Sequence, residues 1–244
     1  MRNFDPAKSF GESVAAVYDV ESVRGDEDDT VSFLERVAAG GPVLELAIGT
    51  GRIGLPLANR GLNVSGIELS PAMAARLAAK PGGDRIQVTI GDFTEAVVPG
   101  EFGLVYVVFN TFFNVLTQDG QVRCFQNAAK HLAAGGAFVI EAFVPSYLYR
   151  LRNDQYVDAE AIEVGEVRLD VGRHDPVDQI LDESHVSLSK AGVSVVPIVV
   201  RYAWPSELDL MARIAGLHLA DRWGGWSNEP FTSTSQRHIS VYRR

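Results

Sequence analysis

A short apolar segment that runs into a glycine-rich turn constrains the fold of this chain more than any other feature. Residues 43–47 read Val-Leu-Glu-Leu-Ala, which predicts a buried strand, and Gly49, Gly51 and Gly54 follow in the pattern GxGxxG. Glycines at a strand-to-helix turn let the backbone approach a ligand and let the helix pack closely on the strand. The pattern alone is weak evidence, because a tight turn without a ligand also produces it.

Strand and helix patterns alternate over the first 145 residues, with short glycine-rich turns between them. Four further strands are predicted, at 63–67, 86–90, 104–109 and 137–142. This alternation predicts a parallel sheet wound by right-handed crossovers. Residues 217–222 and 238–243 are predicted to complete it as an antiparallel pair.

The pattern changes after residue 145. Apolar and polar residues then alternate in three segments, 161–171, 179–188 and 193–202. Such alternation is typical of strands that are covered on one face. We therefore expect an antiparallel meander inserted after the fifth strand, within one domain.

Composition excludes several classes of protein. The 244 residues are 46% apolar, enough for a substantial core, and the net charge of −9 has no basic counter-region that would fit a nucleic acid. The single cysteine, Cys124, excludes an internal disulfide, and the five scattered histidines predict no metal site. Neither a signal peptide nor an 18-residue apolar span occurs, so we expect a cytoplasmic protein without a membrane partner.

Three strand ends carry carboxylates that suit one ligand. Glu45 lies inside a buried strand, where an acid would repel a pyrophosphate and attract an ammonium group; alternatively it caps a backbone group or pairs with an arginine. Glu68 can receive both hydroxyls of a ribose, and Asp92 can accept from an adenine amino group. Together these positions favour S-adenosylmethionine over a nicotinamide dinucleotide.

At these residues the chain resembles the class I S-adenosylmethionine-dependent methyltransferases. Seven segments carry the resemblance: 43–51, 67–73, 91–93, 107–110, 131–141, 201–217 and 237–242. It implies a Rossmann-like α/β fold with a seven-stranded, mostly parallel sheet of order 3-2-1-4-5-7-6. In this fold the last strand is antiparallel, helices flank the sheet, and an antiparallel β insert follows strand 5. Ala47 occupies a position where the family often has glycine. This departure does not weaken the resemblance.

The resemblance also implies the organisation of the single domain that covers residues 1–244. We expect an N-terminal arm or lid (1–25), a cofactor-binding core (26–145), an insert that roofs the acceptor site (146–203), and a closing helix and hairpin (204–244). The predicted cofactor-binding residues are Tyr18, Glu45, Ala47, Gly49, Thr50, Gly51, Glu68, Leu69, Met73, Gly91, Asp92, Phe93, Phe109, Asn110 and Thr111.

Two features resemble methyltransferases that act on sugar amines, glycine and antibiotic precursors: the Val-Tyr-Asp arm at 17–19 and the insert. Tyr18 is the predicted catalytic residue, as a polar group that orients the acceptor, although it also fits a helix-face aromatic. Arg24 could meet the cofactor carboxylate, but solvent exposure is the favoured interpretation. The predicted substrate contacts are Phe112, Phe113, Asn114 and Trp226, against the alternative that the aromatic residues pack in the core.

We therefore predict methyl transfer to a small metabolite, within secondary metabolism, by positioning of the reactants rather than by a strong base. No histidine follows a strand end, which favours an amine acceptor over a hydroxyl. The alternatives are an O-methyltransferase for a hydroxylated or carboxylated metabolite, a non-catalytic S-adenosylmethionine binder, a nicotinamide oxidoreductase, and a macromolecule methyltransferase. The fourth strand lacks the Asn/Asp-Pro-Pro-Tyr/Phe sequence of many DNA and glutamine methyltransferases. A monomer or homodimer is expected.

Overall fold

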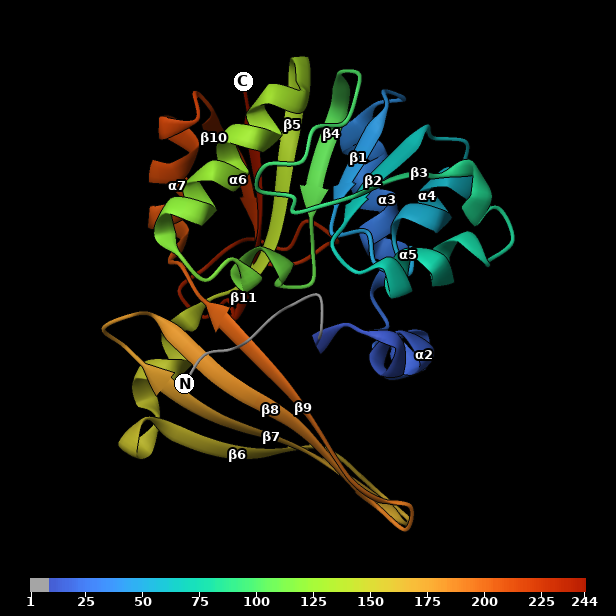
Figure 1. Cartoon of the computed structure of the whole chain (residues 1–244). Coiled ribbons are helices and arrows are strands. Elements are labelled where there is room, and N and C mark those ends of the chain that lie inside the picture. Colours follow the sequence, from blue (N-terminus) through green and yellow to red (C-terminus); the bar gives the residue numbers. More distant parts are fainter. Residues whose placement is uncertain (1–8) are drawn as a thin grey trace.

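The computed structural model describes residues 9–244 and contains two sheets. The larger sheet has the order β10-β11-β5-β4-β1-β2-β3 (Figure 1). β11 is antiparallel to β5 and to β10, whereas β5, β4, β1, β2 and β3 are parallel to one another. The predicted order 3-2-1-4-5-7-6 is confirmed, with β11 and β10 in the last two places. The strands are β1 (Val43–Leu46), β2 (Val64–Glu68), β3 (Gln87–Ile90), β4 (Phe102–Val107), β5 (Leu132–Phe143), β10 (His218–Trp223) and β11 (Arg237–Arg243).

Helices cover both faces of this sheet. Successive side chains of a strand point to opposite faces, and both faces carry apolar residues. In β1, Leu44 and Leu46 belong to one buried cluster, together with Cys124 of α6, and Val43 belongs to the other, together with Phe33 of α3. Buried parallel strands have this two-sided apolar character. The helices are α2 (Glu12–Glu21), α3 (Glu27–Ala38), α4 (Gly54–Asn59), α5 (Pro71–Ala78), α6 (Gln118–His131) and α7 (Pro205–Ile214).

Short 3-10 turns join several of these elements. They are η1 (Gly83–Arg85), η2 (Thr111–Asn114), η3 (Pro145–Arg150) and η4 (Arg152–Asp154). Among residues 9–244, no helix is both long and apolar enough to cross a bilayer.

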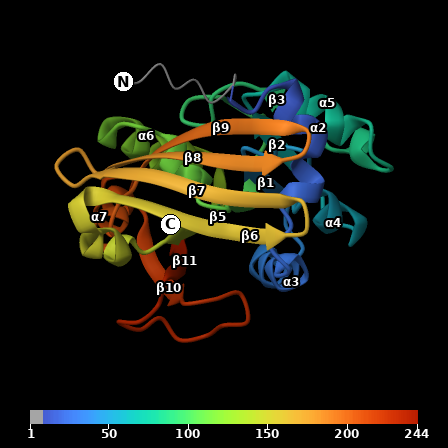
Figure 2. The same cartoon turned by 90° about the horizontal axis from the view of Figure 1, so that it is seen from below.

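The second sheet lies beyond the carboxyl ends of the parallel strands, with α2 beside it (Figures 1 and 2). It consists of β6 (Gln155–Glu163), β7 (Glu166–Asp175), β8 (Ile180–Ser189) and β9 (Gly192–Arg201), all antiparallel to their neighbours. The expected meander is therefore present, but the expectation of three segments is wrong. The segment 161–171 crosses the β6–β7 hairpin turn, where Gly165 has a φ of +96°.

A buried polar pair connects the second sheet to the main one. The guanidinium of Arg201, at the end of β9, donates to the side-chain oxygen of Gln121 at 2.6 Å. The Gln121 amide donates in return to the Arg201 carbonyl at 2.7 Å. Because Gln121 lies on α6, this pair fixes the base of the second sheet against the main domain.

Candidate active site

The turn after β1 adopts left-handed backbone conformations at three positions. Ala47 has a φ of +57°, Gly49 of +57° and Gly51 of +78°. A Cβ atom added to Gly51 would lie 2.4 Å from Leu77 Cδ1, so close packing on α5 requires glycine there. Ala47, the departure from the family pattern, holds a conformation that glycine adopts freely and that strains an alanine by about 1 kcal/mol.

Glu68, at the end of β2, connects this turn to the start of α5. One carboxylate oxygen accepts from the Gly49 N–H at 2.8 Å, and the other accepts from the Ser70 N–H at 2.7 Å. The residue is buried, and burial raises the pKa of its carboxyl group. Each oxygen retains a further lone pair, so the carboxylate can also receive hydroxyl groups from a ligand.

A cavity of about 280 Å³ opens at these strand ends. Nine of the predicted cofactor-binding residues line it: Tyr18, Ala47, Gly49, Glu68, Leu69, Met73, Asp92, Phe93 and Thr111. One Asp92 oxygen accepts from the Thr94 N–H at 2.7 Å, which orients the carboxylate after β3. The cavity thus combines a carboxylate at each end with apolar side chains between them.

Four other predicted cofactor residues, Glu45, Thr50, Gly51 and Gly91, lie outside the lining of this cavity. Glu45 is buried beside the start of α4, and its Oε2 has no hydrogen-bond partner among the described residues. Burial raises its pKa to about 8. The Thr50 hydroxyl donates to Asp19 of α2 at 2.6 Å. The Glu45 and Thr50 side chains therefore lie beside the turn and support it without facing the cavity.

A second cavity, of about 570 Å³, lies between α2, the end of β4 and the second sheet. Phe109, Asn110 and Thr111 contribute to its lining, as do Glu160, Arg168 and His185 of the second sheet. Four residues line both cavities: Phe10, Tyr18, Thr111 and Asn114. The two cavities therefore meet at a common wall.

Tyr18 is the polar aromatic residue of this wall. Its ring lies 6.4 Å from that of Phe10 in an edge-to-face arrangement. Burial raises the pKa of its phenol, so the hydroxyl group stays protonated at neutral pH and can donate a hydrogen bond. This suits a residue that orients a partner rather than one that removes a proton.

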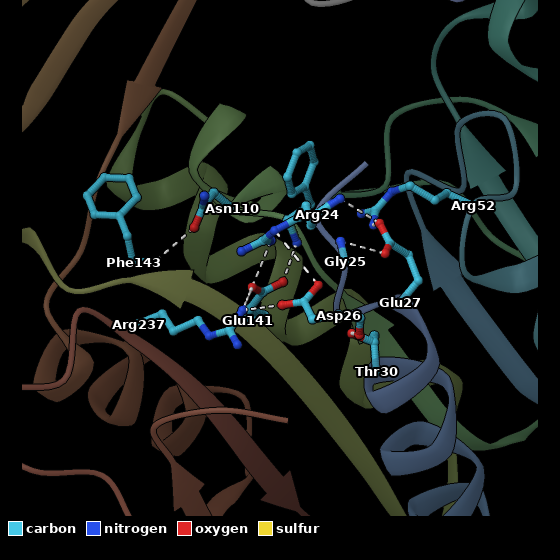
Figure 3. Close-up of polar contacts among 11 residues, drawn as sticks. Arg24, Gly25, Asp26, Glu27, Thr30, Arg52, Asn110, Glu141, Phe143 and Arg237 are labelled. Atoms are coloured by element: carbon cyan, nitrogen blue, oxygen red, sulfur yellow. Dashed lines mark hydrogen bonds and ion pairs between the residues drawn. The ribbon is translucent and has the colours of Figure 1, made fainter. Parts of the chain in front are cut away.

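The loop after β4 is held in an unusual conformation. Phe109 and Asn110 have φ values of +61° and +59°. The Phe109 N–H donates to Glu141 at 2.8 Å. The Asn110 side chain accepts from the Phe143 N–H at 2.8 Å (Figure 3). The Glu141 side chain and the Phe143 backbone, both of β5, thus fix the loop that lines the second cavity.

Two arginines lie over the Phe109 ring. The guanidinium carbons of Arg24 and Arg52 are each 4.7 Å from the ring centroid. Arg24 also pairs with Glu141 at 2.8 Å, and Arg52 pairs with Glu27 at 3.1 Å (Figure 3). The expectation of a solvated Arg24 is wrong, because these partners leave only 23% of its side chain exposed.

Three of the four predicted substrate contacts lie in the core instead. Phe112 and Phe113 are fully buried, with Phe112 packed on Phe125 at 5.5 Å between centroids and Phe113 on Phe143 at 5.0 Å. Trp226 is 2% exposed and packs on Phe33 at 5.3 Å. Neither cavity is lined by any of them, so their placement at the acceptor site is wrong; large aromatic rings gain more from burial. Asn114 lines both cavities.

Sequence reasoning missed the polar residues of the second sheet. His185 lines the second cavity, and its Nδ1 lies 2.6 Å from the Asp170 carboxylate. The two residues are directly opposite each other on β8 and β7. Predicting this pair from the sequence requires the exact register of the β7–β8 hairpin. The predicted segment ended at residue 171, whereas β7 continues to Asp175, so the register was not defined.

Comparisons with known proteins agree with this geometry. A family model described as a methyltransferase domain matches residues 43–136. The solved CcbJ methyltransferase from Streptomyces caelestis is 35% identical, with a TM-score of 0.92 over 98% of this chain and 99% of that one. The chain belongs to the methyltransferases.

Two further relatives cover nearly the whole chain. A cypemycin N-terminal methyltransferase from Streptomyces is 26% identical over 96% of this chain and 97% of that protein. The S-adenosylmethionine-bound amino pentose methyltransferase CalS10 from Micromonospora echinaspora has a TM-score of 0.70 at 21% identity, over 100% of this chain and 99% of that one. At 21% identity, the likeness to CalS10 shows a shared fold only.

Proposed function

We propose that this enzyme transfers the methyl group of S-adenosylmethionine to a nitrogen atom of a small amine, as part of secondary metabolism. The observation that carries the proposal is the wall shared by the two cavities at Phe10, Tyr18, Thr111 and Asn114. A donor in the first cavity and an acceptor in the second would meet there. The bound donor supplies a methyl group already activated by a sulfonium, so alignment and exclusion of water are the main tasks of the protein.

The first cavity fits the adenosine part of the donor. Glu68 would receive the ribose hydroxyls through its remaining lone pairs, and the second oxygen of Asp92 would accept from the adenine amino group. Leu69, Met73 and Phe93 would enclose the adenine ring.

The donor site can be tested by binding alone. We expect Glu68→Ala and Asp92→Ala each to weaken S-adenosylhomocysteine binding at least tenfold in isothermal titration calorimetry, because each removes an acceptor for a donor group. Glu163→Ala, on the exposed end of β6, is the matched control. Unchanged affinity in both site variants would contradict the assignment, and stabilisation by NADH instead would favour an oxidoreductase.

The preference for nitrogen rests on the acceptor side of the wall. Tyr18 is a neutral donor there, and the second sheet presents Glu160, whose carboxylate can hold a positively charged amine. The names of the relatives, an N-terminal methyltransferase and an amino pentose methyltransferase, point in the same direction.

A label-transfer screen tests the acceptor. The enzyme is incubated with S-adenosylmethionine carrying a trideuterated methyl group and with amines, alcohols and metabolite extracts, and mass spectrometry locates the label. Label on nitrogen is expected. Label on oxygen would favour the O-methyltransferase alternative, and tight donor binding without any transfer would favour a non-catalytic binder.

Tyr18→Phe tests the residue predicted to orient the acceptor. This change keeps the ring and removes the hydroxyl group, so we expect kcat to fall about tenfold, the effect of one lost hydrogen bond, while donor affinity stays unchanged. An unchanged kcat would assign Tyr18 a packing role only.

A further inference from the structure

The inner face of the second sheet points toward the second cavity. On β8 and β9 this face contains Leu181 and Val200, which are buried against the main domain. His185 lies on the same face, four residues further along β8, with Asp170 opposite it on β7 and Val196 opposite it on β9. Because successive side chains of a strand point to opposite faces, the His185 side chain points into the space between the second sheet and α2.

The contacts of His185 leave one ring nitrogen without a hydrogen bond. Nδ1 lies 2.6 Å from the Asp170 carboxylate, an ordinary hydrogen-bond distance. Nε2 lies 3.7 Å from Glu183, which is too long for a hydrogen bond, and Glu183 already accepts from the Tyr156 hydroxyl. An aspartate on Nδ1 favours the tautomer in which Nε2 has a free lone pair.

Apart from Arg168 of β7, the charged groups that lie beside this ring or line its cavity are acidic. They are Asp170 of β7, Glu183 of β8, Glu160 of β6 and Glu21 of α2; β9 contributes Val196 and Ser194. Arg168 lies 3.9 Å from Glu160, so part of its charge is offset. The hydrogen bond to Asp170, followed by the charges of Glu183 and Asp170, raises the pKa of His185 although burial opposes this. His185 is therefore a stronger base than a free histidine.

We propose that His185, held by Asp170, is the base that accepts a proton from the acceptor's ammonium group in the second cavity. This inference rests on the proposed amine methylation. The ammonium N–H bond breaks and its proton binds to Nε2, which frees the nitrogen lone pair. That lone pair forms the new N–CH₃ bond as the methyl–sulfur bond breaks, with the electron pair of the broken bond remaining on sulfur. The imidazolium then releases its proton to water.

The tautomer and basicity of His185 can be measured without a known acceptor. We propose long-range ¹H–¹⁵N spectra of ¹⁵N-histidine-labelled protein bound to S-adenosylhomocysteine, with EDTA present and His185 assigned by His185→Gln. We expect the Nδ1–H tautomer and a titration midpoint above that of exposed His218, and a lower midpoint in Asp170→Asn. An Nε2–H tautomer, or a midpoint at or below that of His218, would overturn the proposal.

Single-turnover transfer to two amine probes, glucosamine and L-alanyl-L-alanine, provides the kinetic test. Where the wild type methylates either probe, we expect His185→Gln to lower the rate about 100-fold or more and to remove the rise of the rate with pH. His218→Gln is the matched control, and S-adenosylhomocysteine affinity should remain unchanged in both variants. An unaltered rate and pH profile in His185→Gln would refute a base. Failure of the proposed function has a different signature, which is label on oxygen in the wild type.

Discussion

Three residues other than glycine have left-handed backbone conformations and line a cavity: Ala47, Phe109 and Asn110. Five further non-glycine residues with a positive φ line neither cavity: Ala39, Asn153, Asp154, Gln179 and Asn228. Such conformations persist only where surrounding contacts determine them, and here Glu141 and the Phe143 N–H hold the loop after β4. These contacts therefore keep the strained backbone of the site in place.

Gly51→Ala tests the requirement for glycine at the turn. The new methyl group would meet Leu77 and would also impose a positive φ on alanine, so we expect a loss of about 2 kcal/mol or more in the free energy of unfolding by urea. Gly61→Ala is the matched control, because Gly61 has a φ of +95° but nothing within 4 Å of the added Cβ. Equal losses in the two variants would show that backbone strain alone explains the effect.

Glu45→Gln tests the buried carboxyl behind the turn. Its pKa is 4.5 in an ordinary setting and about 8 here, mainly because of burial, so the folded state binds this proton more tightly than the unfolded state. The associated stability is complete below pH 4.5 and is lost as the pH rises through about 8. We expect the unliganded glutamine variant to gain on wild type over this range, by at least about 2 kcal/mol at pH 9. If the free energies of unfolding of wild type and variant changed with pH in parallel, the raised pKa of Glu45 would be contradicted. Glu163→Gln is the control.

Which site residues could be predicted from the sequence depends on what positions them. Glu68 ends β2 and Asp92 follows β3, and the carboxyl ends of parallel strands meet at one edge of the sheet, so their order in the chain was sufficient. Met73, in α5, was predicted from the family resemblance. Phe112 and Trp226 could not be placed, because an aromatic residue after a strand fits a core as well as a pocket.

At the level of elements, α2 is fastened to the glycine turn by polar contacts. Lys80, which follows α5, donates to the Thr50 carbonyl and pairs with Asp19 of α2, both at 2.7 Å. Thr50 itself donates to Asp19. The helix that contains Tyr18 is thus connected to the turn that faces the donor.

Lys80→Met should loosen this attachment without unfolding the enzyme. Both partners are partly exposed, so we expect less than about 1 kcal/mol of lost stability, but faster amide hydrogen exchange over residues 12–21. Lys190→Met, in the exposed β8–β9 turn, is the control. Unchanged exchange in α2 would indicate that Thr50 and apolar packing are sufficient to hold it.

The second sheet shows where predicting elements from sequence stops. Alternation correctly indicated antiparallel strands after β5, but the turn at Val164 and Gly165 lies within a continuous alternating segment and was overlooked. Asp170 and His185 pair across the next hairpin, β7–β8, whose strands end at Asp175 and begin at Ile180. Because the predicted segments ended at 171 and began at 179, they did not define the register of this hairpin.

At the scale of the whole molecule, the two cavities are built from different parts of the chain. Residues 155–201 contribute to the lining of the second cavity and none of them lines the first. The alternation of strands and helices predicted a parallel sheet with right-handed crossovers, and the family resemblance supplied the strand order. The placement of the second sheet depends on contacts between distant residues such as Gln121 and Arg201.

Val196→Trp tests this separation. The larger side chain would fill the second cavity opposite His185, so we expect methyl transfer to be lost while S-adenosylhomocysteine affinity stays within about twofold, since no donor contact changes. Val195→Trp places the same side chain on the opposite, exposed face and should be active. A marked loss of donor affinity in Val196→Trp would show that the cavities are not independent.

The position of α2 has a kinetic consequence. Because this helix lines both cavities through Tyr18, its displacement opens both together. Departure of the demethylated donor and departure of the methylated product then depend on one motion. Stopped-flow measurements are accordingly expected to give similar rate constants for the two release steps, and Lys80→Met should increase both in parallel.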